Sequence, residues 1–173
     1  NEILVSSTGV IGEKFDPRLI INKFEKLNSK NKNSLLMASN AIMTTDTFPK
    51  LSIKNIKIDS QSFKIYGIAK GSGMIQPNMG TMLVYIFMEC EASKQLMTKL
   101  LKNNLENTFN SITVDSDTST SDTLMMFSVG NKKINLNKKN FKILNNKMHD
   151  LMHDLSLQVI KDGEGVSKLI IVN

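Results

Sequence analysis

The stretch KLSIKNIKIDSQSFKIYGIAK, residues 50–70, decides what kind of fold this chain can form. Each half partly alternates apolar and polar residues, which is typical of a strand with one face against a core. The polar run DSQS, residues 59–62, lies between the halves and predicts a short connection. We therefore expect an antiparallel hairpin at the centre of the fold.

Further strands and helices are expected on both sides of this hairpin. The apolar runs ILVSSTG (3–9), TMLVYIFMEC (81–90), SITV (111–114), TLMMFSVG (123–130) and SKLIIVN (167–173) predict strands or other buried elements. Helical signals occupy residues 16–27, where Asp16 is the expected N-cap and Pro17 the first helical residue, and residues 34–43. The chain therefore predicts α/β layers with a mixed or antiparallel sheet.

Two longer helices are predicted by apolar residues at helical spacing. The first lies within residues 91–107, with its apolar face formed by Leu96, Met97, Leu100, Leu101 and Leu105. The second ends at Gly163, and its apolar face is formed by Phe141, Leu144, Met148, Leu151, Met152, Leu155 and Val159.

Composition indicates one globular domain and argues against two classes of partner. Of 173 residues, 40% are hydrophobic and 22% charged, and no apolar run approaches the roughly 18 residues that span a bilayer, so no membrane partner is expected. The net charge of +6 comes almost entirely from dispersed Lys, with Arg18 the only Arg, which argues against a nucleic-acid partner. The single Cys90 fits a reducing compartment, so a cytoplasmic location is expected.

Two motifs suggest metal ions but lack required ligands. His149 and His153 of HDLMH have the spacing of a zinc protease, but Asp150 stands where Glu is needed and the chain has no third His. The run DSDTSTSDT, residues 115–123, begins like a calcium loop but lacks its later Gly and Glu. We interpret them as a polar helix flank and a polar loop, and expect no metal.

The pair Gly80–Thr81 joins a glycine-rich loop to a buried strand. A Thr hydroxyl needs a neighbouring base, and a chain break before the Thr supplies one as the freed α-amine. The reference pKa of such an amine, roughly 7.7–8.0, leaves a useful fraction neutral near pH 7. The small Gly80 permits the tight turn that self-cleavage requires. Gly–Thr at the start of a strand is also a common structural feature, so the residues alone leave this open.

Five motifs in order resemble the ornithine acetyltransferase family of arginine biosynthesis, also called glutamate N-acetyltransferases. They are SSTGVIG (6–12), AIMTTDTFPK (41–50), AKGSGMIQPNMGTML (69–83), FNSITVDSDTSTSDT (109–123) and KDGEGVSK (161–168). The resemblance implies a layered α/β sandwich and a precursor that cleaves itself between Gly80 and Thr81. Residues 1–80 would end the alpha chain and residues 81–173 would begin the beta chain of one catalytic domain.

The resemblance also implies an activity. Thr81 would take the acetyl group from N2-acetyl-L-ornithine as an ester and pass it to L-glutamate, without a cofactor or metal. Some family members also use acetyl-CoA. The two cleaved chains would stay together and associate as a heterotetramer. The chain begins at Asn1 rather than Met. We expect it to be a central piece that lacks the family's terminal segments and some substrate-binding residues.

Site residues follow from the same motifs. Thr8 and Gly9 match the pair that stabilises the oxyanion, while Thr44, Lys70, Thr81 and Glu164 match substrate-binding positions. Gly80 stands where the family usually has Ala, and Ser116 and Ser121 replace a Gly and an Asn. Without the resemblance, Lys70 would be interpreted as a solvated loop residue and Glu164 as a turn residue. An amide hydrolase using Thr81 and an uncleaved, non-catalytic fragment are the alternative functions.

Overall fold

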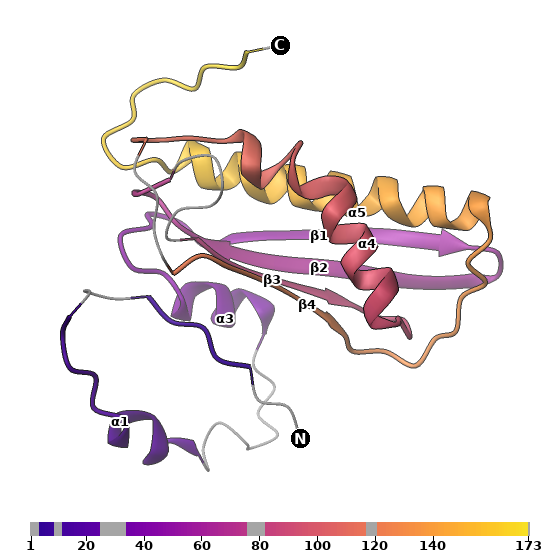
Figure 1. The fold of residues 1–173 in the computed structure, drawn as a ribbon, viewed down its shortest axis with the longest axis horizontal. Helices are drawn as coiled ribbons and strands as arrows, with labels where there is room; N and C mark the ends of the chain where they lie inside the picture. Colours follow the sequence, from indigo (N-terminus) through magenta and orange to yellow (C-terminus); the bar gives the residue numbers. More distant parts are fainter. Residues whose placement is uncertain (1–3, 9–11, 25–33, 76–81, 117–120, 173) are drawn as a thin grey trace.

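Figure 1 shows a computed structural model of the chain, which describes residues 4–8, 12–24, 34–75, 82–116 and 121–172. At its centre is a four-stranded sheet in the order β1-β2-β3-β4. The strands are β1 (Lys50–Ile58), β2 (Gln61–Lys70), β3 (Leu83–Met88) and β4 (Thr123–Ser128). β2 pairs antiparallel with both β1 and β3, whereas β4 runs parallel to β3. The predicted α/β fold with a mixed sheet is confirmed.

The predicted hairpin is formed by β1 and β2. The pairing runs from Lys50 opposite Ala69 to Ile58 opposite Gln61. Only two residues connect the strands, and the first of them, Asp59, has a φ of 53°. A positive φ is expected in the two-residue turns that match the twist of antiparallel strands, and Asp tolerates it better than most residues.

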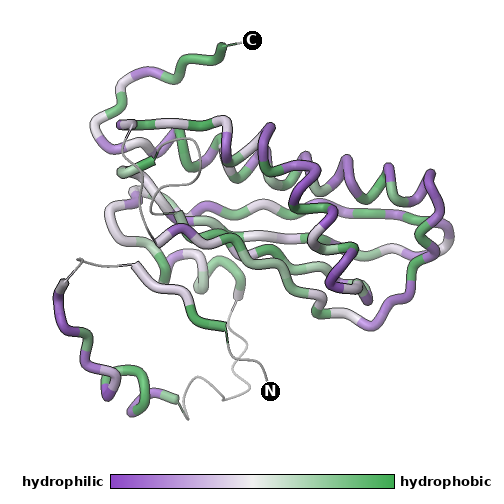
Figure 2. Tube along the Cα trace, viewed as in Figure 1, coloured by the Kyte–Doolittle hydropathy of each residue, from purple (hydrophilic) through white to green (hydrophobic). Residues whose placement is uncertain are grey.

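Two helices cover one face of the sheet (Figure 1). They are α4 (Lys94–Leu105) and α5 (Lys138–Lys161), and the side chains of Ser93 and Asn137 cap their first turns. The apolar residues predicted for both helices are buried or packed against the core. Hydrophilic and hydrophobic residues alternate along α5 in Figure 2, as expected for a helix with one face in water.

The opposite face of the sheet carries a row of aromatic rings. Tyr66, Phe87 and Phe127, on β2, β3 and β4, stack with centroid separations of 5.5 and 5.3 Å. The short helix α3 (Leu35–Ala41) contacts β1 and β2 and lies on the other side of the sheet from α5 in Figure 1.

Several predicted elements are shorter than expected or absent. Residues 4–8, 112–114 and 166–172 form no strand. The last of these segments is apolar but exposed, with Val172 90% accessible. A strand requires a hydrogen-bonded neighbour, which apolar character alone does not provide. Of the helix expected over residues 16–27, the described residues contain α1 (Arg18–Ile21), whose N-cap is Pro17 rather than Asp16 and whose apolar residues are not buried, while residues 25–27 lie outside the described residues. Short helices depend on such packing.

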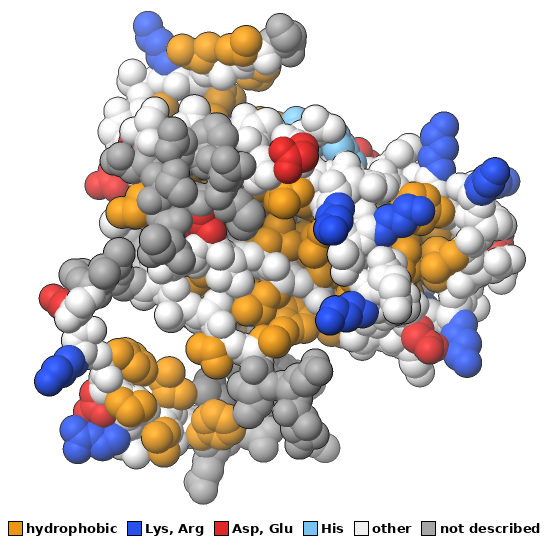
Figure 3. Space-filling model, in the orientation of Figure 1, with side chains coloured by type: hydrophobic (Ala, Val, Ile, Leu, Met, Phe, Trp, Pro, Cys, Tyr) orange, Lys and Arg blue, Asp and Glu red, His pale blue; other side chains and the backbone are white. Residues whose placement is uncertain are grey.

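No helix among the described residues is long and apolar enough to cross a membrane. On the face shown in Figure 3, Lys and Arg side chains are spread over the surface and do not form one continuous basic patch.

Candidate functional site

The residues of interest gather at one end of the sheet, where α5 also ends (Figure 1). Lys70 is the last residue of β2 and pairs with Leu83, the first residue of β3. Lys50 begins β1 opposite Ala69, so Lys50 and Lys70 belong to opposite faces of the sheet. The parallel strand β4 begins beside Leu83. Antiparallel and parallel pairing together therefore bring these strand ends to the same edge.

Lys70 and Thr44 form a direct contact at this edge. The Nζ of Lys70 donates a hydrogen bond to Oγ1 of Thr44 over 3.0 Å. Lys70 is only 2% exposed, and burial lowers the pKa of its ammonium group, while the charge of Asp46 acts in the opposite direction. The structure therefore places two residues that were predicted to bind substrate in contact with each other. It also shows that Lys70 is buried and is not a solvated loop residue.

Glu164 lies on the other side of the loop that follows Lys70. Its backbone N–H donates to the carbonyl oxygen of Ser72 over 2.6 Å. A Cβ at Gly73 would lie 2.9 Å from Oε2 of Glu164, so the carboxylate rests against the glycine backbone. The short loop 71–73 therefore follows the buried ammonium group of Lys70 in the chain and contacts the carboxylate of Glu164.

Asp115 fixes the same loop from the polar stretch that was compared with a calcium site. Its carboxylate accepts hydrogen bonds from the backbone N–H groups of Met74 and Ile75. The N–H of Val114 also donates to the carbonyl of Ile75 over 2.8 Å. At Asp115 these contacts agree with the predicted side-chain-to-backbone hydrogen bonding, while residues 117–120 of this stretch lie outside the described residues.

Asp122 holds the residue that follows Thr81 in the chain. Its Oδ1 accepts the N–H of Met82 over 2.8 Å, and the carbonyl of Met82 accepts the N–H of Thr123 over 3.0 Å. Burial raises the pKa of Asp122 to about 6. Its second oxygen is buried and has no hydrogen-bond partner among the described residues. Sequence reasoning did not single out Asp122.

The predicted oxyanion and cleavage residues are only partly described. Thr8 is half-buried in a segment that contacts β3, where Ser6 Oγ lies 2.5 Å from the hydroxyl of Tyr85. Gly9, Gly80 and Thr81 lie outside the described residues. Their predicted roles therefore stay predictions.

The sequence analysis also did not predict the buried ion cluster beside Lys70. The Nζ of Lys50 lies 2.5 Å from a carboxylate oxygen of Asp46 and 2.5 Å from one of Asp162. Asp46 belongs to the motif AIMTTDTFPK and Asp162 to the motif KDGEGVSK, but nothing local in the sequence pairs these two residues. An inward-facing Lys at the start of an alternating strand is the one signal that could have indicated a buried partner.

Other candidate residues have structural explanations. The rings of His149 and His153 stack with centroids 5.7 Å apart on the helix flank, and no group of three possible metal ligands occurs within the described residues. Cys90 is fully buried, and burial raises its thiol pKa to about 11, which leaves it a poor nucleophile.

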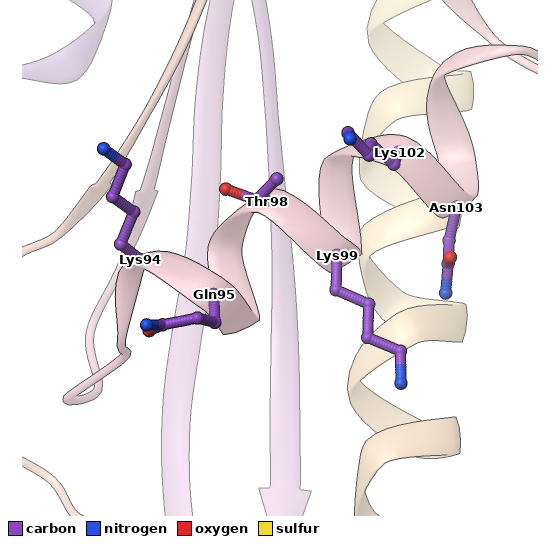
Figure 4. Close-up of a pocket in the computed structure, with 6 residues that line it drawn as sticks. All are labelled: Lys94, Gln95, Thr98, Lys99, Lys102 and Asn103. Atoms are coloured by element: carbon purple, nitrogen blue, oxygen red, sulfur yellow. The ribbon is translucent and has the colours of Figure 1, made fainter.

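A surface hollow of about 560 Å³ lies along α4, away from these residues. It is lined by Lys94, Gln95, Thr98, Lys99, Lys102 and Asn103. Figure 4 shows these side chains projecting from a single helix. The Nζ of Lys99 is engaged 4.6 Å from the ring centroid of Phe141. Because all of these lining residues come from α4, we assign the hollow no role.

Fold and site together define a mixed α/β protein in which a buried Lys–Thr pair and a carboxylate flank one loop at the end of a sheet. The ArgJ family model matches residues 1–173. The chain therefore belongs to the ArgJ family.

Curated relatives match almost the whole chain. The arginine biosynthesis bifunctional protein ArgJ of Bartonella henselae is 42% identical over 178 residues, which cover 100% of this chain and 43% of that protein. The protein of the same name from Ruegeria pomeroyi is 44% identical, with 97% of this chain and 41% of that protein covered. A mitochondrial relative of the same name from Dictyostelium discoideum is 40% identical. The match covers 98% of this chain and 39% of that protein. The chain thus spans about two fifths of their length.

Solved structures show looser similarity. An L-aminopeptidase D-Ala-esterase/amidase from Ochrobactrum anthropi superposes with a TM-score of 0.46 at 11% identity, covering 70% of this chain and 43% of that chain. The PH0078 protein from Pyrococcus horikoshii OT3 superposes with a TM-score of 0.48 at 8% identity. The match covers 70% of this chain and 42% of that chain.

Proposed function

We propose that this chain is part of an acetyltransferase of arginine biosynthesis that moves the acetyl group of N2-acetyl-L-ornithine to L-glutamate. Membership of the ArgJ family supports this assignment. The observation that carries it is the arrangement of Lys70 with Thr44 before loop 71–73 and Glu164 against it. Both substrates carry a carboxylate and a cationic group, so a binding site of opposite charges suits them.

The proposed reaction passes through an ester on Thr81. After self-cleavage at Gly80–Thr81, the freed α-amine takes the proton of the Thr81 hydroxyl, whose oxygen attacks the acetyl carbon. Thr8 and Gly9 stabilise the negative charge that develops on the acetyl oxygen. The C–N bond then breaks, and ornithine leaves with the proton held by the amine. The neutral amino group of glutamate then attacks the ester carbon, and the α-amine of Thr81 passes the proton that glutamate loses to the Thr81 oxygen as the C–O bond breaks, so the proposed steps use no cofactor or metal.

Pairing of β2 with β3 supports the proposal that the cleaved chains stay together. Their register runs from Ile65 opposite Met88 to Lys70 opposite Leu83. The cut at Gly80–Thr81 falls in the connection between these two strands. The backbone hydrogen bonds of the sheet would therefore join the two products. Association of two such pairs as a heterotetramer and a cytoplasmic location complete the proposal, and acetyl-CoA is a candidate second acetyl donor.

The test uses the full-length protein with N-acetylornithine, in the presence and absence of glutamate. Stoichiometric formation of ornithine and N-acetylglutamate is expected only when glutamate is present. Acetate release that glutamate does not change would instead identify an amide hydrolase. A single intact chain in mass spectrometry, together with no turnover, would identify a non-catalytic protein.

A further inference from the structure

Lys50 lies at the centre of a buried ion cluster with two carboxylates. Its side chain is 0% exposed, and those of Asp46 and Asp162 are 0% and 2% exposed. The two carboxylates come from distant parts of the chain, since Asp46 lies 4 positions before Lys50 and Asp162 lies 112 positions after it. Hydrogen bonds and the charge of Lys50 lower the pKa of both carboxyl groups against the opposing effect of burial, so both are ionised near neutral pH.

Asp46 connects this cluster to the Lys70 side of the site. Its Oδ1 accepts the N–H of Gly71 over 2.7 Å, and its Oδ2 accepts the N–H of Thr44 over 3.1 Å. Gly71 directly follows Lys70 in the chain, and Thr44 accepts the hydrogen bond from the Lys70 ammonium group. A shift of the Asp46 carboxylate would therefore move the Lys70–Thr44 pair.

Asp162 connects the same cluster to the Glu164 side. It follows the last residue of α5 and precedes Glu164 by two positions. Its carboxylate accepts the N–H of Thr47 over 3.0 Å, which ties the end of α5 to the loop before β1. A hydrogen bond of 2.6 Å between the hydroxyl groups of Thr45 and Ser72 continues this connection into loop 71–73.

Stability alone gives a weak reason for such a cluster. Desolvating three charges offsets most of their mutual attraction, and replacing buried ion pairs by apolar groups often leaves stability unchanged or increases it. A cluster with fixed hydrogen bonds does, however, define distances between the segments that it joins. Here those segments carry the two oppositely charged groups of the substrate site.

We propose that Lys50 is a positioning residue that sets the separation between the Lys70 ammonium group and the Glu164 carboxylate, and thereby the affinity for substrates carrying both charges. The inference rests on the proposed acetyltransferase function. Lys50 acts through Asp46 and Asp162 and touches no substrate itself.

The experiment compares steady-state kinetics of full-length variants after self-cleavage. Lys50→Met combined with Asp46→Asn and Asp162→Asn removes all charges of the cluster together, so no carboxylate is left buried without its partner. We expect KM for both N-acetylornithine and glutamate to rise about 10-fold or more, while kcat changes by less than about 3-fold, because the reacting groups are untouched. Lys50→Arg keeps the charge with a different shape and should fold, with a smaller rise in both KM values.

Lys54→Met is the matched control. Lys54 also lies on β1 and forms an ion pair with α5, 3.1 Å from Asp154, but it is partly exposed and makes no contact with Asp46 or Asp162. Its removal should leave KM and kcat unchanged. Wild-type KM values in the folded triple variant would overturn the positioning role. If the triple variant does not fold, wild-type KM values in Lys50→Arg would overturn it. Absence of acetyl transfer by the wild-type enzyme would instead refute the function on which it rests.

Discussion

The ammonium nitrogen of Lys70 lies 3.0 Å from the hydroxyl oxygen of Thr44, although the two residues are 26 positions apart in the sequence. One of the three N–H groups of Lys70 is used in this contact, and the side chain is almost completely buried. A buried ammonium group with a fixed orientation is suited to bind a substrate carboxylate, because little side-chain entropy remains to be lost on binding.

Replacement of Lys70 by Met should therefore weaken substrate binding and change the pH profile. Met keeps a long apolar stem but cannot bind a carboxylate, so KM should rise about 10-fold or more. In the wild type, the positive charge of Lys70 should lower the pKa of the Thr81 α-amine if they lie within roughly 6 Å. The lower limb of the pH–rate profile should then move to higher pH in Lys70→Met. An unmoved limb would show that Lys70 does not act on the amine.

Thr81→Ala should abolish both self-cleavage and acetyl transfer, because one hydroxyl serves both reactions. Thr81→Ser keeps a hydroxyl and should retain part of each activity. Mass spectrometry of the purified proteins measures cleavage directly. Separation of the Thr81→Ala protein into two chains would assign the nucleophile to another residue.

Thr8→Ala should lower turnover by roughly 10²–10³ with little change in KM, because the hydroxyl acts only when charge develops on the acetyl oxygen. Steady-state kinetics with N-acetylornithine measures both parameters. Lost affinity with an unchanged turnover number would place Thr8 in substrate binding.

Gly73→Ala should displace the carboxylate of Glu164. The added Cβ would lie 2.9 Å from Oε2, and the flexible end of the Glu side chain can move at small cost in stability. We expect the melting temperature to change little and KM to rise several-fold. In a Glu164→Gln background the same substitution should have a much smaller effect on KM, since the two changes act on one interaction. Additive effects in this double-mutant cycle would argue against the contact.

Asp122→Asn should make stability less dependent on pH. The folded-state pKa of about 6 lies above the ordinary value of 3.8 for an Asp side chain, so ionising Asp122 costs more in the folded protein. Its contribution to stability is fully present below about pH 4 and is lost as pH rises through about 6. Because Asp122 is only partly buried, the cost at neutral pH is on the order of 2 kcal/mol.

The measurement is the difference in melting temperature between variant and wild type from pH 4 to pH 7.5. Asn can still accept the N–H of Met82, so this difference should increase in favour of the variant as pH rises. A difference that stays constant across this range would show that Asp122 ionises as readily in the folded as in the unfolded protein.

The sequence by itself determined the elements whose signals are local. The β1–β2 hairpin followed from alternation around a two-residue turn, and the buried faces of α4 and α5 followed from helical spacing. Membership of the family also followed from ordered motifs and is confirmed. The described residues 4–8 and 166–172 form none of the strands expected there, because apolar composition does not specify the neighbouring strand that must supply hydrogen bonds.

Only the tertiary structure decided which charged residues share the interior. No local signal pairs Asp162 with Lys50 and Asp46, yet burial makes an unpaired charge costly, so the folded chain brings all three together. Likewise, Asp122 became notable only when parallel pairing of β3 and β4 brought it to the N–H of Met82. The sequence determines which elements form because their stabilising contacts are local, whereas the geometry of the site depends on contacts between residues about 25 to 115 positions apart.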